Sequence, residues 1–161
     1  MVTSVKELFD AIVVFEKNVG QLYDSISEDV RKQFGVFFEN MAQDEYRHAK
    51  IYQALGERAQ NEDITLSDPG EVAYVQSLIE GTTFDKEGNF LANAKKVKSK
   101  HQVLDMAEKV EREAIQYVYE LARLFPDFAK DQVAILLQEE QKHLQMVLDR
   151  KKEATVGYIG L

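Results

Sequence analysis

The sequence predicts an all-α protein, a four-helix bundle made of two helical hairpins that a long crossover joins. Apolar residues recur at spacings of three and four along four long stretches, which is the period of a helix with one buried face. The chain also matches itself without a gap when it is shifted by 95 positions, so it contains the same hairpin twice. Neither hairpin is large enough to bury its own apolar face, and we therefore expect the two to pack against each other.

The first hairpin is expected at about residues 4–56. Its first helix begins at Ser4, where Ser4 and Glu7 have the spacing of a capping box, and runs to about Ser27. The second helix follows a short polar turn. We predict that it stops at Gly56, because glycine is the preferred residue just past the C-terminus of a helix.

The second hairpin is expected at about residues 99–152. Ser99 and Gln102 form a second capping-box pattern at its start, and the first of its helices ends near Pro126. The last helix runs from about Asp127 to Lys152 along an apolar face. Residues 153–161 remain as a tail without a predicted role.

Residues 57–98 form the crossover between the hairpins. This polar stretch is too long for a tight connection and can run the length of the bundle. Within it, Asp68 and Pro69 predict the start of a short helix that Gly81 ends. We treat residues 1–161 as a single domain, because the length is typical of one domain with a substantial core.

Composition and charge exclude several classes of function. The net charge of −8 argues against the broad basic surface that nucleic acid or anionic lipid would need. No apolar run approaches the roughly 20 residues that cross a bilayer, and the start of the chain lacks a signal pattern, so we expect a cytoplasmic protein. The absence of cysteine excludes disulfides, thiolate catalysis and iron–sulfur clusters within the sequence.

Four glutamates lie where a helical bundle has its core. Glu16, Glu45, Glu111 and Glu140 are each surrounded by apolar residues at the helical spacings of three, four and seven. Burial of a carboxylate costs several kcal/mol unless it is protonated, paired or coordinated. Lysine and arginine are nearly absent from these faces, whereas two divalent cations would neutralise four carboxylates.

Two histidines point to the same site. His48 follows Glu45 by three residues and His143 follows Glu140 by three, which puts an oxygen and a nitrogen side by side on each helix. We therefore predict a site for two metal ions, with Glu45 and Glu140 between the ions. The mixed set of oxygen and nitrogen ligands favours iron, with manganese or zinc as alternatives. The predicted ligands are Glu16, Glu45, His48, Glu111, Glu140 and His143.

We interpret four further residues of these helices as ordinary surface or core residues. His101, in the first turn of the second hairpin, is expected at the surface, and Glu139 is expected to be solvated. Tyr23 and Tyr52 are expected to be core aromatics, although their position one and two turns from ligands would allow hydrogen bonds to the site.

Four segments resemble the rubrerythrin-type, ferritin-like di-iron proteins over about residues 4–152. They are Phe15-Glu16-Lys17 with its continuation to Tyr23, Asp44-Glu45-Tyr46-Arg47-His48-Ala49, Val110-Glu111-Arg112-Glu113-Ala114-Ile115 and Glu139-Glu140-Gln141-Lys142-His143-Leu144. The resemblance implies a ferritin-like four-helix bundle with two irons, a homodimer, and reduction of peroxide.

The chain departs from that family's pattern at two points. Rubrerythrins carry a further glutamate three residues after the ligand of the third helix, and this sequence has Ala114 there. They also carry a four-cysteine rubredoxin module that delivers electrons, and the sequence has no cysteine. An oxidoreductase of this type would therefore take its electrons from an external donor protein.

The reaction itself stays open at this stage. The first hypothesis is an oxidoreductase that reacts with peroxide or O₂, and the second is a protein that oxidises, stores or delivers iron. A third is a structural bundle whose metal pair does not react. Neither a nucleic acid nor a membrane is an expected partner.

Overall fold

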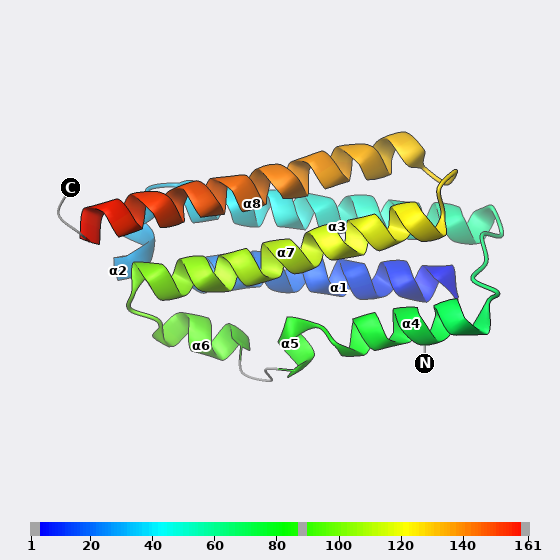
Figure 1. The fold of residues 1–161 in the computed structure, drawn as a ribbon, viewed down its shortest axis with the longest axis horizontal. Helices are drawn as coiled ribbons and strands as arrows, with labels where there is room; N and C mark the ends of the chain where they lie inside the picture. Colours follow the sequence, from blue (N-terminus) through cyan, green and yellow to red (C-terminus); the bar gives the residue numbers. More distant parts are fainter. Residues whose placement is uncertain (1–3, 87–89, 159–161) are drawn as a thin grey trace.

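The computed structural model describes residues 4–86 and 90–158 and places four long helices side by side (Figure 1). Helices α1 (Val5–Asp24) and α3 (Phe37–Asn61) form the first hairpin, and α7 (Lys100–Leu124) and α8 (Lys130–Tyr158) form the second. The closest packing is that of α1 on α3 and of α7 on α8. The predicted all-α, ferritin-like four-helix bundle is thereby confirmed.

The two predicted capping boxes have different outcomes. At the start of α1, the Ser4 hydroxyl accepts from the Glu7 amide at 3.2 Å, and the Ser4 amide donates to the Glu7 carboxylate at 3.0 Å. At the start of α7, Ser99 is the N-cap residue, but its side chain makes no capping hydrogen bond. That second prediction was wrong, and the first turn of α7 relies on the backbone bond from Val103 to Ser99 instead.

The connection between α1 and α3 contains two short helical pieces rather than a plain turn. They are α2 (Glu28–Arg31) and the 3₁₀-helix η1 (Lys32–Phe34). Gly35 follows with a φ of 59°, a left-handed conformation that glycine adopts without steric cost and that ends the 3₁₀ turn.

Helix α3 does not stop at Gly56 but continues to Asn61, so the predicted end was wrong. Gly56 is buried, and a Cβ atom at this position would lie 2.8 Å from Cβ of Phe9 on α1. Gly20 plays the same part on α1, since a Cβ there would lie 2.6 Å from the ring of Tyr46. Both glycines therefore serve the close approach of α1 and α3, which a sequence pattern does not distinguish from a helix stop.

The last helix also differs in its bounds. Ala129 has a φ of 48°, so that α8 begins at Lys130, and it then continues to Tyr158 through most of the predicted tail. Residues 159–161 of that tail lie outside the described part of the chain.

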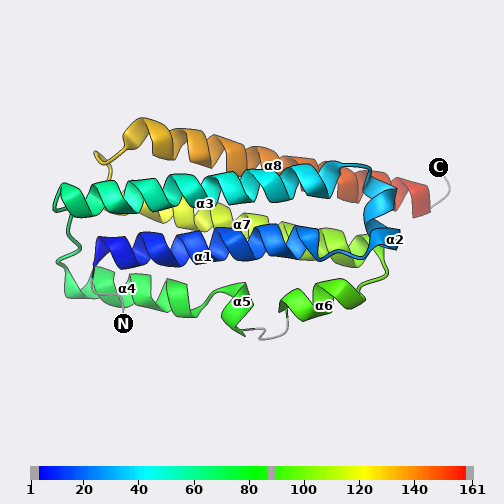
Figure 2. The same cartoon turned by 180° about the vertical axis from the view of Figure 1, so that it is seen from behind.

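The crossover runs along the length of the bundle beside α1 and α7 (Figures 1 and 2). It contains α4 (Pro69–Glu80), α5 (Thr83–Lys86) and α6 (Phe90–Lys96). The predicted start of α4 is confirmed, because the Asp68 side chain accepts from the Glu71 amide at 2.9 Å and Pro69 occupies the first turn. Gly81 is the C-cap of α4, as predicted.

None of the helices in residues 4–86 and 90–158 is long and apolar enough to cross a lipid bilayer.

The contact of Gly56 with Phe9 gives the first testable prediction. Gly56→Ala should destabilise the fold, because the gain in helix propensity is smaller than the cost of forcing α1 and α3 apart. We expect a net loss of about 1–2 kcal/mol in the free energy of unfolding, measured by chemical denaturation. Glu57→Ala, at an exposed position of the same helix, is the matched control. Equal or greater stability of Gly56→Ala would contradict the packing role.

Candidate metal centre

All six predicted ligands meet in the middle of the bundle. Helix α1 supplies Glu16, α3 supplies Glu45 and His48, α7 supplies Glu111, and α8 supplies Glu140 and His143. None of the six exposes more than 2% of its surface. Each helix turns its apolar face inward, and the acidic residues within those faces are therefore carried into the core.

The two histidines and the two glutamates of the Glu-x-x-His motifs form the centre of the cluster. One atom of each of these four residues lies within 4.8 Å of the others. Nδ1 of His48 lies 3.2 Å from Oε2 of Glu45 and 2.8 Å from Oε1 of Glu140. Nδ1 of His143 lies 2.8 Å from Oε1 of Glu45 and 3.6 Å from Oε2 of Glu140. Each of these glutamates thus turns one oxygen toward each histidine, as a carboxylate that bridges two ions does.

Glu16 and Glu111 complete the cluster from the other two helices. An oxygen of Glu111 lies 3.7 Å from Nδ1 of His143, and its other oxygen accepts a hydrogen bond from the hydroxyl of Tyr23. Glu16 is fully buried, and neither of its oxygens has a hydrogen-bond partner among the described residues. Ala114, one turn after Glu111, is buried as well and adds no further ligand.

Most of the buried polar side-chain atoms without a hydrogen-bond partner in the described residues belong to this cluster. In the described part of the chain, the atoms without a hydrogen-bond partner include both oxygens of Glu16 and of Glu140, one oxygen each of Glu45 and Glu111, and Nδ1 of His143. His143 Nδ1 and Glu45 Oε1 are close but lack the direction of a hydrogen bond. Buried polar atoms are nearly always satisfied in native proteins. A set of oxygen and nitrogen atoms that converge without partners fits a pair of metal ions.

Burial and mutual repulsion control the protonation of the metal-free site. Burial, followed by the charges of Glu140 and Glu45, raises the pKa of Glu16 well above its usual value. Burial likewise raises the pKa of Glu111 to about 8. For Glu45 burial acts in the same direction, but contact with His143 and His48 outweighs it and lowers the pKa.

The pKa values of the two histidines are raised, because their contacts with the glutamates outweigh the effect of burial. Burial lowers the pKa of His48, but its contacts with Glu140 and Glu45 outweigh burial and raise the pKa to about 10. The pKa of His143 is raised too, because its contacts with Glu111, Glu140 and Glu45 outweigh burial. In the metal-free site these shifts favour the protonated form of both imidazoles, of Glu16 and of Glu111.

A second layer of carboxylates holds the outer nitrogens of the two rings. Nε2 of His48 lies 2.7 Å from Glu139, and Nε2 of His143 lies 3.1 Å from Asp44. Arg47 bonds to both carboxylates, at 2.9 Å from Glu139 and 3.3 Å from Asp44. Such outer partners fix the orientation of a metal-binding histidine, and here they leave Nδ1 of each ring facing the glutamates.

The expectation that Glu139 is solvated therefore holds only in part. Only 32% of its side chain is exposed, because it lies against His48 of the other hairpin. The signal was present in the sequence, since the offset of 95 residues aligns Asp44 with Glu139 just as it aligns Glu45 with Glu140. His101 is exposed, as predicted.

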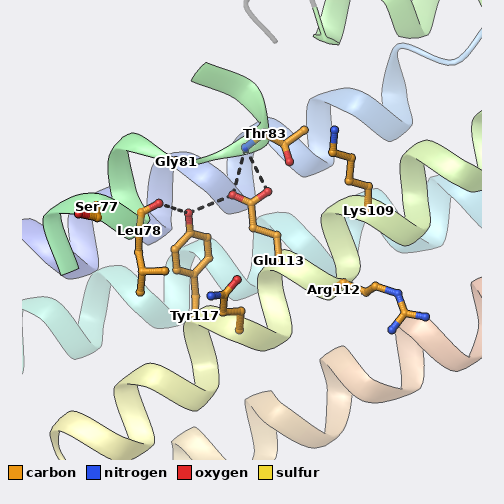
Figure 3. Close-up of a pocket in the computed structure, with 9 residues that line it drawn as sticks. Ser77, Leu78, Gly81, Thr83, Lys109, Arg112, Glu113 and Tyr117 are labelled. Atoms are coloured by element: carbon orange, nitrogen blue, oxygen red, sulfur yellow. Dashed lines mark hydrogen bonds between the residues drawn. The ribbon is translucent and has the colours of Figure 1, made fainter. Parts of the chain in front are cut away.

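The surface pockets lie elsewhere. One of 440 Å³ lies between the crossover and α7, where Glu113 accepts hydrogen bonds from the Thr83 amide and the Tyr117 hydroxyl (Figure 3). The same hydroxyl lies 3.4 Å from the carbonyl oxygen of Leu78 on α4. These bonds attach the crossover to the bundle, and none of the six predicted ligands lines this pocket.

Comparison with known proteins agrees with the site. The family model described as rubrerythrin matches residues 8–150, a span that contains all six predicted ligands. Searches of curated proteins and of solved structures found no match.

The protonation of the site gives a second prediction. Coordination requires unprotonated carboxylates and imidazoles, so anaerobic loading with Fe²⁺ at pH 7 should release protons from Glu16, Glu111, His48 and His143. Because the pKa of Glu111 is about 8, the number released should fall as pH rises through that value. Calorimetry in buffers of different ionisation enthalpy measures the release. Metal binding without proton release would contradict the assignment.

Proposed function

We propose that this chain, which belongs to the rubrerythrin family, is a di-iron oxidoreductase that reduces peroxide or O₂ with electrons from an external donor protein. The observation that carries the proposal is the set of four carboxylates and two imidazoles, all buried, whose facing atoms lack partners in the described part of the chain. Two divalent cations balance the charge of four carboxylates. The mixed oxygen and nitrogen set favours iron over a structural zinc site.

The predicted ligands would have different roles in binding the two ions. Glu45 and Glu140 would bridge the two ions, since each already faces both histidines. His48 and His143 would bind through Nδ1, because Nε2 of each ring is held by Glu139 or Asp44. When bound, a pair of iron ions would supply the electrons that reduce peroxide or O₂.

The residues around the site would exclude water and fix the orientation of one predicted ligand. Apolar residues of all four long helices surround the ligands, and a dry site strengthens every electrostatic interaction within it. Tyr23 holds Glu111 by a hydrogen bond across the two hairpins. Gly20 leaves no room for a substrate, because the ring of Tyr46 fills the space beside it. The small side chain of Ala114, one turn after Glu111, supports the view that a small substrate has room there.

These 161 residues contain no cysteine to hold a rubredoxin-type iron, so we propose that the electrons come from outside them. This is the basis for proposing a separate donor protein. We also expect a homodimer, because family members commonly are dimers. A location in the cytoplasm likewise stays a prediction.

Stopped-flow mixing of the anaerobic Fe²⁺ form with H₂O₂, and separately with O₂, tests the reaction. The proposal predicts rapid oxidation by at least one of them and repeated turnover when a reductant is added. Replacement of the bridging residue Glu45 by Ala should reduce turnover at least about 100-fold, because a bridging ligand acts on both ions. Glu57→Ala, an exposed change on the same helix, is the control.

The alternatives predict different results in the same experiment. A protein that stores iron would accumulate many ferric ions per chain without repeated turnover of peroxide. A structural metal pair would react with neither oxidant, and either outcome would overturn the proposed activity.

A further inference from the structure

The hydroxyl of Tyr52 on α3 stands apart from the other polar groups around the site. Tyr52 is fully buried, yet its hydroxyl has no hydrogen-bond partner among residues 4–86 and 90–158. A buried hydroxyl without a partner costs folding free energy, and phenylalanine would fill the same space without that cost. An unpaired group of this kind in a native protein calls for a reason beyond packing.

The register of α1 against α3 places this hydroxyl near the metal centre. Gly20 contacts Tyr46 and Gly56 contacts Phe9, so that Glu16 lies opposite the turn of α3 just before Tyr52. Side chains on a helix lean toward its N-terminus, which directs the ring of Tyr52 back toward the level of Glu16. In agreement, burial and then the charges of Glu16, Glu140 and Glu45 raise the pKa of Tyr52, so that it keeps its proton.

The other donors around the centre are already in use. The hydroxyl of Tyr23 donates to Glu111, and the outer nitrogens of the two histidines are held by Glu139 and Asp44. The atoms that the six predicted ligands turn toward one another are carboxylate oxygens and the two Nδ1 atoms, which are the kinds of atom that coordinate a metal. In the described part of the site, the Tyr52 hydroxyl is thus the donor that remains uncommitted.

The internal repeat shows that the hydroxyl is not needed to build the ligand set. The offset of 95 residues relates the three ligands of the first hairpin to the three of the second, and it places Val147 at the position equivalent to Tyr52. Val147 is fully buried, so an apolar side chain packs at that position in the second hairpin. The first hairpin carries an additional polar group that its copy lacks.

We propose that the Tyr52 hydroxyl donates a hydrogen bond to a small oxygen- or nitrogen-containing ligand bound at the metal centre, the chemical class that includes peroxide and azide. Tyr52 would then touch the substrate of the proposed oxidoreductase and orient it within a site that otherwise offers it no free donor. This inference rests on the proposed function for the presence of the metal pair and for the class of substrate.

Azide binding to the Fe³⁺-loaded protein tests the inference without any turnover. Spectrophotometric titration should show azide binding about tenfold weaker in Tyr52→Phe than in the wild type, the effect of one hydrogen bond to a charged ligand. The metal content should be unchanged. Tyr119→Phe, which removes an exposed tyrosine hydroxyl of α7, is the matched control and should bind azide as the wild type does.

A second measurement uses the observation that the Tyr52 hydroxyl has no hydrogen-bond partner in the described residues. Metal-free Tyr52→Phe should be as resistant to chemical denaturation as the metal-free wild type, or more so, because the substitution removes an unsatisfied group. Unchanged azide affinity in Tyr52→Phe, or no azide binding by the wild type, would overturn the inference. Loss of metal from Tyr52→Phe would overturn the inference too, because the hydroxyl would then help to retain the metal. Lower stability of the metal-free variant would also overturn it, because the hydroxyl would then stabilise the fold. Failure of the wild type to reduce either peroxide or O₂ would overturn the proposed function alone.

Discussion

Four carboxylates buried in one apolar core are the constraint on which the rest of this structure depends. Glu16, Glu45, Glu111 and Glu140 come from four different helices, and each is fully buried. Without compensation they would repel one another at short range in a medium that screens charge poorly. Protons on some of them and on the two histidines relieve this in the metal-free protein, and divalent cations relieve it more completely. Because both hairpins supply predicted ligands, metal binding would also tie one hairpin to the other.

The internal repeat explains why the site is nearly symmetric, and the surrounding layer shows where the symmetry ends. Each hairpin supplies three of the six predicted ligands and one of the two outer carboxylates, Asp44 or Glu139. Arg47, by contrast, corresponds to Lys142, and only Arg47 reaches both outer carboxylates in the described structure. Its planar guanidinium suits two carboxylates at once, and it thereby links the orientation of one histidine to that of the other. Tyr23 and Tyr52 are likewise restricted to the first hairpin, with valines at the equivalent positions.

Much of this arrangement could be predicted from the sequence, because helical spacing alone fixes which residues share a face. The apolar neighbours of Glu16 and Glu111 along each helix were enough to place both in the core. The position of Gly56 could not be interpreted in the same way, since glycine serves both as a helix stop and as a site of close helix contact. The bond from Tyr23 to Glu111 joins residues 88 positions apart and depends on how the two hairpins rotate against each other. The contact of Glu139 with His48 was not predicted, although the repeat aligns Glu139 with Asp44. Glu139 lies on the helix face that borders the surface, and such a position is usually solvated.

Elemental analysis of the protein purified from its native host is the sharpest test of whether the six core residues hold two metal ions. We expect two metal ions per folded chain, with iron as the metal. A folded chain that carries no metal, or a single zinc ion, would contradict it, because the buried carboxylates would then have to be balanced in another way.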